Sequence, residues 1–343
     1  MWQDGRRHMK RAISWLACLH LSLLASLAEA QDARSTSYDR YLKPGELIEI
    51  APGRRLNLRC EGSGSPTVIL EAGHAFPSLS WRDVQPALAR ITCTCAYDRA
   101  GLGFSDPGPM PRSADAIVDD LAALLVKAHL PGPYILVGSS LGGQTVRLFA
   151  FRYPARVAGL VLVDPYVEGQ FSAFAAIDPS IGEEVEQGLR EEATCVDALR
   201  KGALTPAQAE KQGCIAGSNP RFSPTLNEML QRQRMRPAWF EAARSESLML
   251  DTDNEQQIAR AKRHLGDMPL IVLSAARNFD DPIYAKHRSA LRAEQMRLHG
   301  GLAALSRSGE VRLIEADHVI QSDSPNEVIK AVRDMIARSR PGK

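Results

Sequence analysis

A serine stands at the centre of a Gly-x-Ser-x-Gly sequence at residues 138–142. The apolar run at 133–137 predicts a buried strand before it, and residues 143–150 predict a helix after it. A sharp turn between a strand and a helix lifts a serine hydroxyl above the end of a sheet, and the flanking glycines leave room for the close crossing. The pattern therefore predicts that Ser140 is the nucleophile of a nucleophile elbow.

A serine hydroxyl is a weak nucleophile at neutral pH, so it needs a base within hydrogen-bonding distance and an acid that orients this base. His318 is the best candidate base, because it follows the last predicted strand (311–314) and precedes the last predicted helix (326–338). In an alternating α/β architecture this loop opens at the same edge of the sheet as Ser140. Three other histidines are expected on helices or at helix ends, in contact with solvent: His129, His287 and His299.

Strands alternate with helices along most of the chain after a predicted hairpin at 47–60. This order predicts a mostly parallel central sheet with helices on both faces. Residues 165–267 contain no convincing strand and are rich in Glu, Gln, Arg and Ala, which predicts a helical cap inserted before the penultimate strand. The expected organisation is therefore a core of residues 31–164 and 269–343 with a cap of residues 165–268.

The order of these segments resembles that of the α/β-hydrolase superfamily, and within it the capped serine esterase-like branch. The matching segments are residues 70–73, 96–106, 138–142, 160–164 and 317–321. They follow the family order of nucleophile, acid and histidine. The resemblance implies the α/β-hydrolase fold and a serine hydrolase that cleaves a carboxylic ester or a related acyl compound. It implies a Ser-His-Asp triad and an acyl-enzyme intermediate, with no cofactor and no metal.

The resemblance allows two positions for the acid of the triad. Asp164 ends the strand after the elbow helix and matches the first position without a shift. The second position follows the strand at 269–273, where Asn278 stands in place of the usual aspartate. Asp164 is the preferred acid, and Asp280 and Asp281, two and three residues beyond Asn278, remain the alternatives.

The resemblance also implies an oxyanion hole of backbone N–H groups that face the developing negative charge. The first N–H group is that of Leu141, at the start of the elbow helix. The second is that of His74, in the loop after the strand at 67–70. Asp98 and Arg99 are expected to fix loops below the active site without taking part in the chemistry.

Three alternatives to an ester hydrolase remain. An amide or peptide hydrolase would use the same triad and would differ in its cap pocket. Relatives that open epoxides or remove halogens carry aspartate at the elbow, so Ser140 argues against both activities. The third alternative is a catalytically inactive family member that acts as a binding protein. Several aromatic residues of the cap either line a substrate pocket or form the core of the cap: Phe171, Phe174, Trp239 and Phe240.

The first 30 residues have the features of a secretory signal peptide, with basic residues at 6–11, an apolar run at 12–27 and an Ala-x-Ala site at 28–30. This segment holds four basic and two acidic residues, so its removal changes the formal charge of +2 to zero. A neutral chain predicts neither nucleic acid nor an acidic membrane as a partner. We expect an exported protein, periplasmic or secreted, with a small ester or acyl substrate and no membrane span after cleavage. The oligomeric state stays open.

Five cysteines follow the predicted signal peptide, and an oxidising compartment favours disulfides. Cys195 and Cys214 lie 19 residues apart in a polar helical region and are predicted to pair. Cys60 is predicted to pair with either Cys93 or Cys95, which leaves one free thiol.

Overall fold

The computed structural model describes residues 38–339 and divides into two compact units. The smaller unit includes residues 38–43 and 216–232, and the larger unit includes residues 44–215 and 233–339. The predicted signal peptide at residues 1–30 lies outside the described residues. No helix within residues 38–339 combines the length and the hydrophobicity that crossing a bilayer requires.

The smaller unit joins two segments that are far apart in the sequence. It contains the 3-10 helix η1 (Asp39–Leu42) and most of helix α8 (Pro224–Arg234). Tyr38 packs edge-to-face against Phe222 with 5.6 Å between the ring centroids, and Arg221 donates a hydrogen bond to the Tyr38 hydroxyl over 2.8 Å.

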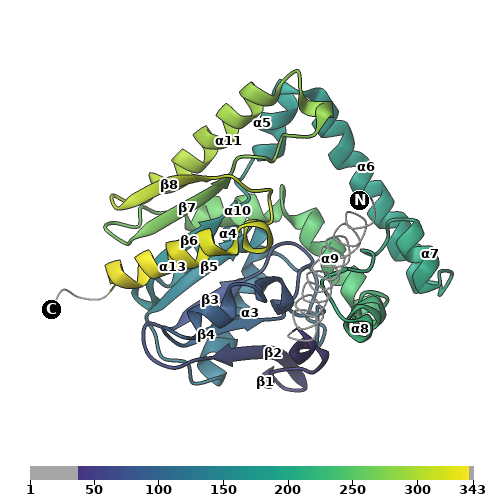
Figure 1. The fold of residues 1–343 in the computed structure, drawn as a ribbon, viewed down its shortest axis with the longest axis horizontal. Coiled ribbons are helices and arrows are strands. Elements are labelled where there is room, and N and C mark those ends of the chain that lie inside the picture. The colour runs from purple at the N-terminus through teal and green to yellow at the C-terminus, as the bar shows by residue number, and fades with distance from the viewer. Residues whose placement is uncertain (1–37, 340–343) are drawn as a thin grey trace, which may run out of the picture. The chain divides into compact units, whose positions relative to one another are not determined.

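The larger unit is built on an eight-stranded sheet with the order β1-β2-β4-β3-β5-β6-β7-β8 (Figure 1). The pairs β1·β2 and β2·β4 are antiparallel, and the other five pairs are parallel. The strands are β1 (Glu46–Ala51), β2 (Arg54–Glu61), β3 (Val68–Glu71), β4 (Thr94–Tyr97), β5 (Tyr134–Ser139), β6 (Val157–Val163), β7 (Leu270–Ala275) and β8 (Gly309–Ile314). The mostly parallel sheet that the sequence predicts is therefore confirmed.

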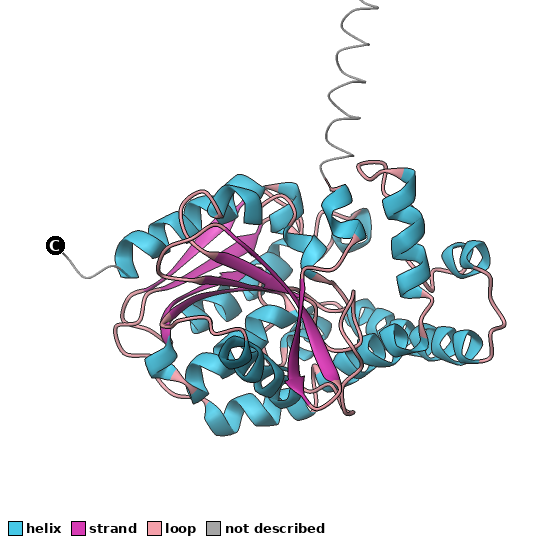
Figure 2. Ribbon diagram, turned by 90° about the horizontal axis from the view of Figure 1, so that it is seen from below, coloured by secondary structure: helices cyan, strands magenta, loops and turns pink. Residues whose placement is uncertain are grey.

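Helices cover both faces of this sheet (Figure 2). On one face lie α3 (Ala114–Lys127), α4 (Leu141–Arg152), α10 (Asp253–Ala261) and α11 (Arg288–Ala303). On the other face lie α2 (Gln85–Leu88), α12 (Ile320–Asp323) and α13 (Pro325–Ser339). Short 3-10 helices connect the elements: η2 (Ser78–Trp81), η3 (Pro154–Arg156) and η4 (Pro282–Tyr284).

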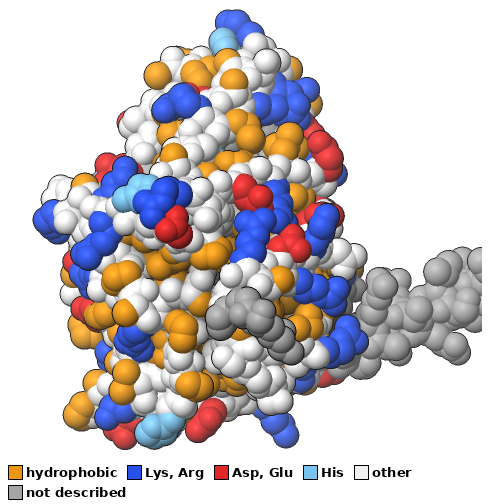
Figure 3. Space-filling model, turned by 90° about the vertical axis from the view of Figure 1, so that its left-hand side faces the viewer, with side chains coloured by type: hydrophobic (Ala, Val, Ile, Leu, Met, Phe, Trp, Pro, Cys, Tyr) orange, Lys and Arg blue, Asp and Glu red, His pale blue; other side chains and the backbone are white. Residues whose placement is uncertain are grey.

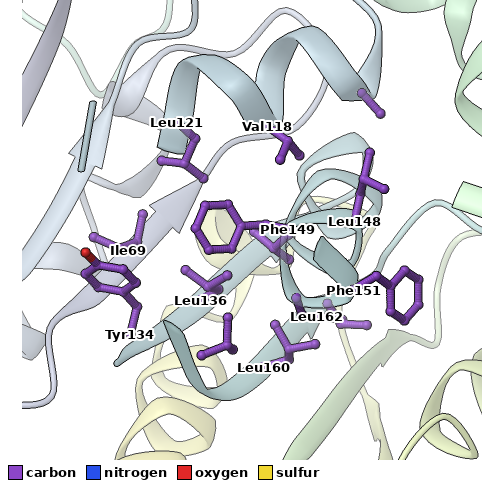
Figure 4. Close-up of a cluster of buried hydrophobic side chains, with 14 of the residues drawn as sticks. Ile69, Val118, Leu121, Tyr134, Leu136, Leu148, Phe149, Phe151, Leu160 and Leu162 are labelled. Atoms are coloured by element: carbon purple, nitrogen blue, oxygen red, sulfur yellow. The ribbon is translucent and has the colours of Figure 1, made fainter. Parts of the chain in front are cut away.

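The apolar sequence of the central strands follows from this double coverage. Every residue of β3, β5 and β7 is buried, whereas the edge strand β8 is partly exposed. Figure 4 shows the core on the face of α3 and α4, where Phe149 lies among Leu121, Leu136 and Leu160. Burial of one such side chain stabilises the fold by about 1.5–3 kcal/mol.

Residues 165–268, which the sequence predicts to be a cap, contain helices and no strand. These helices are α5 (Gln170–Ile177), α6 (Pro179–Arg200), α7 (Pro206–Lys211), α8, α9 (Pro237–Met249) and α10. Within the larger unit, Phe240 packs in a cluster of α6 and α7 side chains, and Trp239 packs with Leu102. Phe174 packs edge-to-face on Phe279 with 5.2 Å between the ring centroids. These three aromatic rings form packed clusters, and the role of the segment as a cap stays a prediction.

Two disulfides are present in the larger unit. Cys195 is bonded to Cys214, as the sequence predicts, and Cys60 is bonded to Cys95. Cys60 and Cys95 are direct partners in the antiparallel register of β2 and β4, which decides between the two partners that the sequence leaves open. Cys93 is the free cysteine of the described residues, and its Sγ lies 3.9 Å from Cys95 Sγ.

Charged side chains of both signs are interspersed with apolar ones on the face of the molecule in Figure 3. Some of the exposed charges of the larger unit form ion pairs, such as that between Arg307 and Asp267 over 2.7 Å. This face therefore presents a mixed charge pattern, and isolated exposed pairs of this kind contribute little to stability.

We expect the double substitution Cys60→Ser/Cys95→Ser to lower the free energy of unfolding by about 3–4 kcal/mol, because the disulfide restricts the unfolded chain across a separation of 35 residues. Urea unfolding under oxidising conditions measures the effect. Cys93→Ser is the matched control, since it removes a free thiol near the same strand without opening a loop. Equal stability of the double variant and the unsubstituted chain would contradict this role.

Candidate active site

Ser140 lies between β5 and α4 with φ 51° and ψ −119°, a backbone conformation that residues other than glycine rarely adopt. Hydrogen bonds from the neighbouring segment hold this turn. Ser140 N donates to Val163 O over 3.1 Å, and Ser140 O accepts from Tyr166 N over 3.0 Å. The end of β6 therefore fixes the strained turn, and Ser140 itself stays partly exposed.

Close backbone contacts explain the two glycines that flank Ser140. A Cβ on Gly138 would lie 2.3 Å from the carbonyl oxygen of Gly142, and a Cβ on Gly142 would lie 2.5 Å from Glu71 O. Both distances are shorter than any van der Waals contact, so a side chain at either position would push α4 away from the sheet.

Four polar residues follow four neighbouring parallel strands at the carboxyl edge of the sheet. Ser140 follows β5, Asp164 follows β6, Asn278 follows β7 and His318 follows β8. Ligands of open α/β sheets bind outside the carboxyl ends of the strands. The strand order by itself therefore gathers these side chains at a place where a substrate can reach them.

Asp164 accepts four hydrogen bonds although its side chain is only 3 % exposed. Oδ2 accepts from His318 Nδ1 over 2.6 Å and from Asn278 Nδ2 over 2.7 Å. Oδ1 accepts from Ala275 N over 2.8 Å and from Gln295 Nε2 over 3.0 Å. Burial acts to raise the pKa of Asp164, but the hydrogen bond and the charge of His318 outweigh it and hold this pKa below 3.8. Asp164 is therefore an anion at neutral pH.

The side chain of His318 is half exposed and is held at one ring nitrogen. The partial loss of solvent around the ring acts to lower the pKa of His318, but the hydrogen bond and the charge of Asp164 outweigh it and raise this pKa above 6.5. Because Nδ1 donates to Asp164, the neutral ring keeps Nε2 as its acceptor.

The loop of His318 is also joined to the elbow. Ser139 Oγ donates to Gln321 Oε1 over 3.3 Å in a buried contact. The hydrogen bonds within residues 38–339 do not include one between Ser140 and His318.

The alternative acids make other contacts. Asp280 forms an ion pair with Arg292, and Asp281 caps η4 by accepting from Ile283 N over 3.0 Å. Asp164 is therefore the one of these three aspartates that contacts His318.

Two side chains of α11 lie under this carboxylate and were missed by the sequence analysis. Gln295 Nε2 donates to Asp164, and His299 Nδ1 lies 2.8 Å from Ser274 Oγ. His299 is 3 % exposed, so the expectation that it contacts solvent is wrong, and burial lowers its pKa below 6.5. The helical spacing could have indicated this burial, because residues 295 and 299 lie on the same face of the helix as the apolar Leu291.

The loop at residues 73–76 lies beside Ser140, since a Cβ on Gly73 would be 3.4 Å from Ser140 Cβ. The backbone N–H of His74 makes no hydrogen bond within residues 38–339. Leu141 is the first residue of α4, and such an N–H group has no acceptor inside its helix. The ring of His74 instead contacts α9, with Nε2 2.8 Å from Ala243 O.

Residues 62–331 match the family model described as the alpha/beta hydrolase family. This chain belongs to the alpha/beta hydrolase family. It is similar to the uncharacterized protein YqjL of Bacillus subtilis (strain 168), with 26% identity over 276 residues that cover 80% of this chain and 85% of that protein. The resemblance that the sequence analysis draws to this superfamily is thereby confirmed.

Two solved structures show the same fold as this alpha/beta hydrolase. The epoxide hydrolase CorEH superposes with a TM-score of 0.63 at 17% identity, over 85% of this chain and 98% of that chain. A thermophilic esterase from Thermogutta terrifontis superposes with a TM-score of 0.55 at 19% identity, over 87% of this chain and 100% of that chain. At these identities the likeness concerns the fold alone, and it confirms the predicted fold class.

The pKa directions at Asp164 and His318 have opposite consequences for stability. The folded-state pKa of His318 is raised, so its pairing stabilises the fold fully below pH 6.5, and this contribution is lost as the pH rises through the folded-state value. The folded-state pKa of Asp164 is lowered, so its contribution is present above pH 3.8 and is lost as the pH falls through the folded-state value.

We expect Asp164→Asn to lower the pKa of His318, because the charge and the charge-assisted hydrogen bond are lost while burial remains. An NMR titration of the imidazole signals measures this pKa. Asp317→Asn is the matched control, since Asp317 pairs with Arg277 and its side chain is 69% exposed. A pKa of His318 that is the same in both variants would contradict the coupling between His318 and Asp164.

Proposed function

We propose that this alpha/beta hydrolase is an exported serine hydrolase that cleaves a carboxylic ester or a related acyl compound. The observation that carries the proposal is the hydrogen bond of His318 Nδ1 to Asp164 Oδ2, at the sheet edge where Ser140 occupies its strained turn. A histidine that a buried carboxylate orients, at the same sheet edge as a partly exposed serine, matches the set of residues that activates a serine hydroxyl. The capped esterase-like branch of the family is part of this proposal.

In the proposed reaction, Ser140 Oγ attacks the carbonyl carbon of the ester, and His318 Nε2 takes the hydroxyl proton. The imidazolium of His318 then gives this proton to the leaving alkoxide, so that the alcohol departs and the acyl group stays on Ser140. Water that His318 deprotonates attacks the acyl-enzyme, and the imidazolium then gives this proton to Ser140 Oγ as the acid leaves, which restores the free serine. Asp164 stays ionised throughout, holds the proton on Nδ1 and stabilises the imidazolium.

The backbone N–H groups of Leu141 and His74 are the proposed oxyanion donors. The N–H of Leu141 lies at the N-terminus of α4, where the helix dipole also favours negative charge. One preorganised donor of this kind accelerates acyl transfer by about 10²–10³-fold.

The nucleophile supports an ester over an epoxide as the substrate. Epoxide-opening relatives carry aspartate at the elbow, whereas this chain has Ser140. An amide hydrolase would use the same residues, but an alkoxide leaves a tetrahedral intermediate more readily than an amine that must first be protonated. Export is proposed on the N-terminal sequence pattern and on the two disulfides.

We expect a fluorophosphonate to label Ser140 in the purified mature protein, and Ser140→Ala to abolish both the labelling and the hydrolysis of p-nitrophenyl esters. The loss of kcat is expected to be on the order of 10⁵–10⁶-fold, as for other triad nucleophiles. Mass mapping of the adduct and a pH-stat assay are the measurements. Ser172→Ala, at an exposed serine of α5, is the control that should keep both activities. A folded protein that is not labelled would favour the binding-protein alternative.

We expect Asp164→Asn to lower kcat/KM by about 10³–10⁴-fold, because the histidine loses the group that fixes its tautomer. The double variant Asp164→Asn/Asn278→Asp is expected to recover about tenfold or more of this loss, because residue 278 contacts the same oxygen that His318 contacts.

Asn278→Asp alone is the control for the double variant. It places two carboxylates in contact and is expected to raise the pKa of one of them and to reduce activity. Steady-state kinetics on one ester compare the three variants. Full activity of Asp164→Asn would contradict the role of Asp164 in this proposal.

A further inference from the structure

One face of α9 is bonded to the loop that carries His74. Ala243, Glu246 and Ser247 are spaced i, i+3 and i+4, so they lie on one side of the helix. Glu246 Oε2 accepts from Ala75 N over 3.0 Å. Ala243 O and Ser247 Oγ lie 2.8 and 2.9 Å from His74 Nε2.

The directions of these hydrogen bonds are fixed by the groups involved. The carbonyl of Ala243 only accepts, so His74 Nε2 carries the proton. Ser247 Oγ donates its own proton to Glu192 Oε1 over 3.2 Å, so it acts as an acceptor toward His74, and the single Nε2 proton is shared between Ala243 O and Ser247 Oγ. The His74 ring is therefore held by α9 through an ordered chain of hydrogen bonds.

Arg99 joins the same helix to the backbone of the loop. Its Nε and Nη2 donate to the two carboxylate oxygens of Glu246 over 2.7 and 2.9 Å. Its Nη1 donates to Ala72 O and its Nη2 to Gly73 O, over 2.7 Å in both cases. The guanidinium is planar and rigid, so Glu246 sets the orientation in which Arg99 holds the two carbonyls.

The bond to Gly73 O also fixes the direction of the His74 N–H. Gly73 C=O and His74 N–H belong to one peptide group, which is planar and trans, so the two bonds point in opposite directions. Arg99 therefore turns the His74 N–H away from itself. A cationic donor on the carbonyl also polarises the peptide and strengthens its N–H as a donor.

Arg99 and its two carboxylate partners are buried. The side chain of Arg99 is 2% exposed, and those of Glu246 and Glu71 are 1% exposed. Burial acts to raise the pKa of Glu246, but the charge and the hydrogen bonds of Arg99 outweigh it and hold this pKa below 4.5. Burial raises the pKa of Glu71, which also accepts a hydrogen bond from the Tyr97 hydroxyl. Glu246 is therefore an anion at neutral pH, and Arg99 contacts both carboxylates, Glu246 through Nε and Nη2 and Glu71 through Nη1 over 2.8 Å.

We propose that Glu246 and Ser247 of α9 are positioning residues for the oxyanion hole. Glu246 acts through Arg99 and the Ala75 N–H, and Ser247 acts through the His74 ring, so that the His74 N–H faces the reacting oxygen. This inference rests on the proposed serine-hydrolase function. It assigns a catalytic contribution to a helix of the segment that the sequence predicts to be a cap.

The packing of α9 supports a fixed position for this helix. A Cβ on Gly101 would lie 2.7 Å from Ala242 Cβ and 2.9 Å from Ala238 O, so α9 lies in close contact with the turn after β4. A movement of α9 away from this turn would release Arg99 and loosen the His74 peptide. The helix is accordingly part of the site rather than a lid that opens freely.

The test compares Glu246→Gln and Ser247→Ala with the control Glu241→Gln. Glu241 lies on the same helix and pairs with Arg200 over 3.0 Å at the surface. For each variant we would measure the amplitude and the second-order rate constant of fluorophosphonate labelling at Ser140. We would also measure kcat and KM for a p-nitrophenyl ester.

We expect Glu246→Gln to lower kcat/KM and the labelling rate constant by about 10–100-fold, and Ser247→Ala by about 3–10-fold, as partial losses of one oxyanion donor. The KM for the ester should change less than about twofold, because the neutral carbonyl of the bound ester gains much less from the oxyanion donors than the transition state does. A merely structural role would reduce the labelling amplitude, which counts folded sites, and would leave the rate constant of the remaining sites unchanged.

Rate constants of both variants equal to that of Glu241→Gln would overturn the inference while the labelled Ser140 still supports the proposed function. If circular dichroism shows that Glu246→Gln does not fold, the labelling rate constant of Ser247→Ala tests the inference instead. This variant leaves no buried charge unpaired. Absence of labelling in the folded, unsubstituted protein would overturn the proposed function and this inference with it.

Discussion

A buried carboxylate at the end of β6 links the elements of the candidate site. Asp164 accepts hydrogen bonds from the loop after β7, from α11 and from the loop after β8. Burying an anion is costly unless its lone pairs are filled, so this carboxylate is stable only while all of these donors stay in place. His318 is thereby held at Nδ1, and its Nε2 makes no hydrogen bond within residues 38–339.

The ends of β5 and β6 both carry strained backbone. Ser140 has φ 51° and Asp164 has φ 41°, in a region that residues with a Cβ rarely occupy. Ladder hydrogen bonds continue past the strands and hold both residues, from Ser140 N to Val163 O and from Asp164 N to Leu273 O. The rigid parallel sheet therefore maintains two unfavourable conformations that project a hydroxyl and a carboxylate from its edge.

The second half of the site depends on a contact between segments that are distant in the sequence. Arg99 and Glu246 are separated by 147 residues, yet their bidentate pair lies against the carbonyls of the loop beside Ser140. The Asp164 cluster orients His318, the proposed base, and the Arg99 cluster orients the loop proposed to bind the oxyanion. Each cluster contains a charged group that the fold has removed from water. Hydrogen bonds to such an ion are stronger in the protein interior than they are in water.

The sequence by itself determined the local patterns, which are the apolar strands, the turn with its glycines around Ser140, and the alternation of strands and helices along the chain. These patterns were enough to predict the family and the sheet edge at which the polar residues meet. These features follow from spacing along the chain, which is a property of the sequence. Only the tertiary structure decided which partners meet: Cys95 rather than Cys93 for Cys60, Asp164 rather than Asp280 or Asp281 for His318, the burial of His299, and the pairing of Glu246 with Arg99. Such contacts depend on strand register and on helix packing between distant segments, and a difference of one residue or a few ångströms changes the partner.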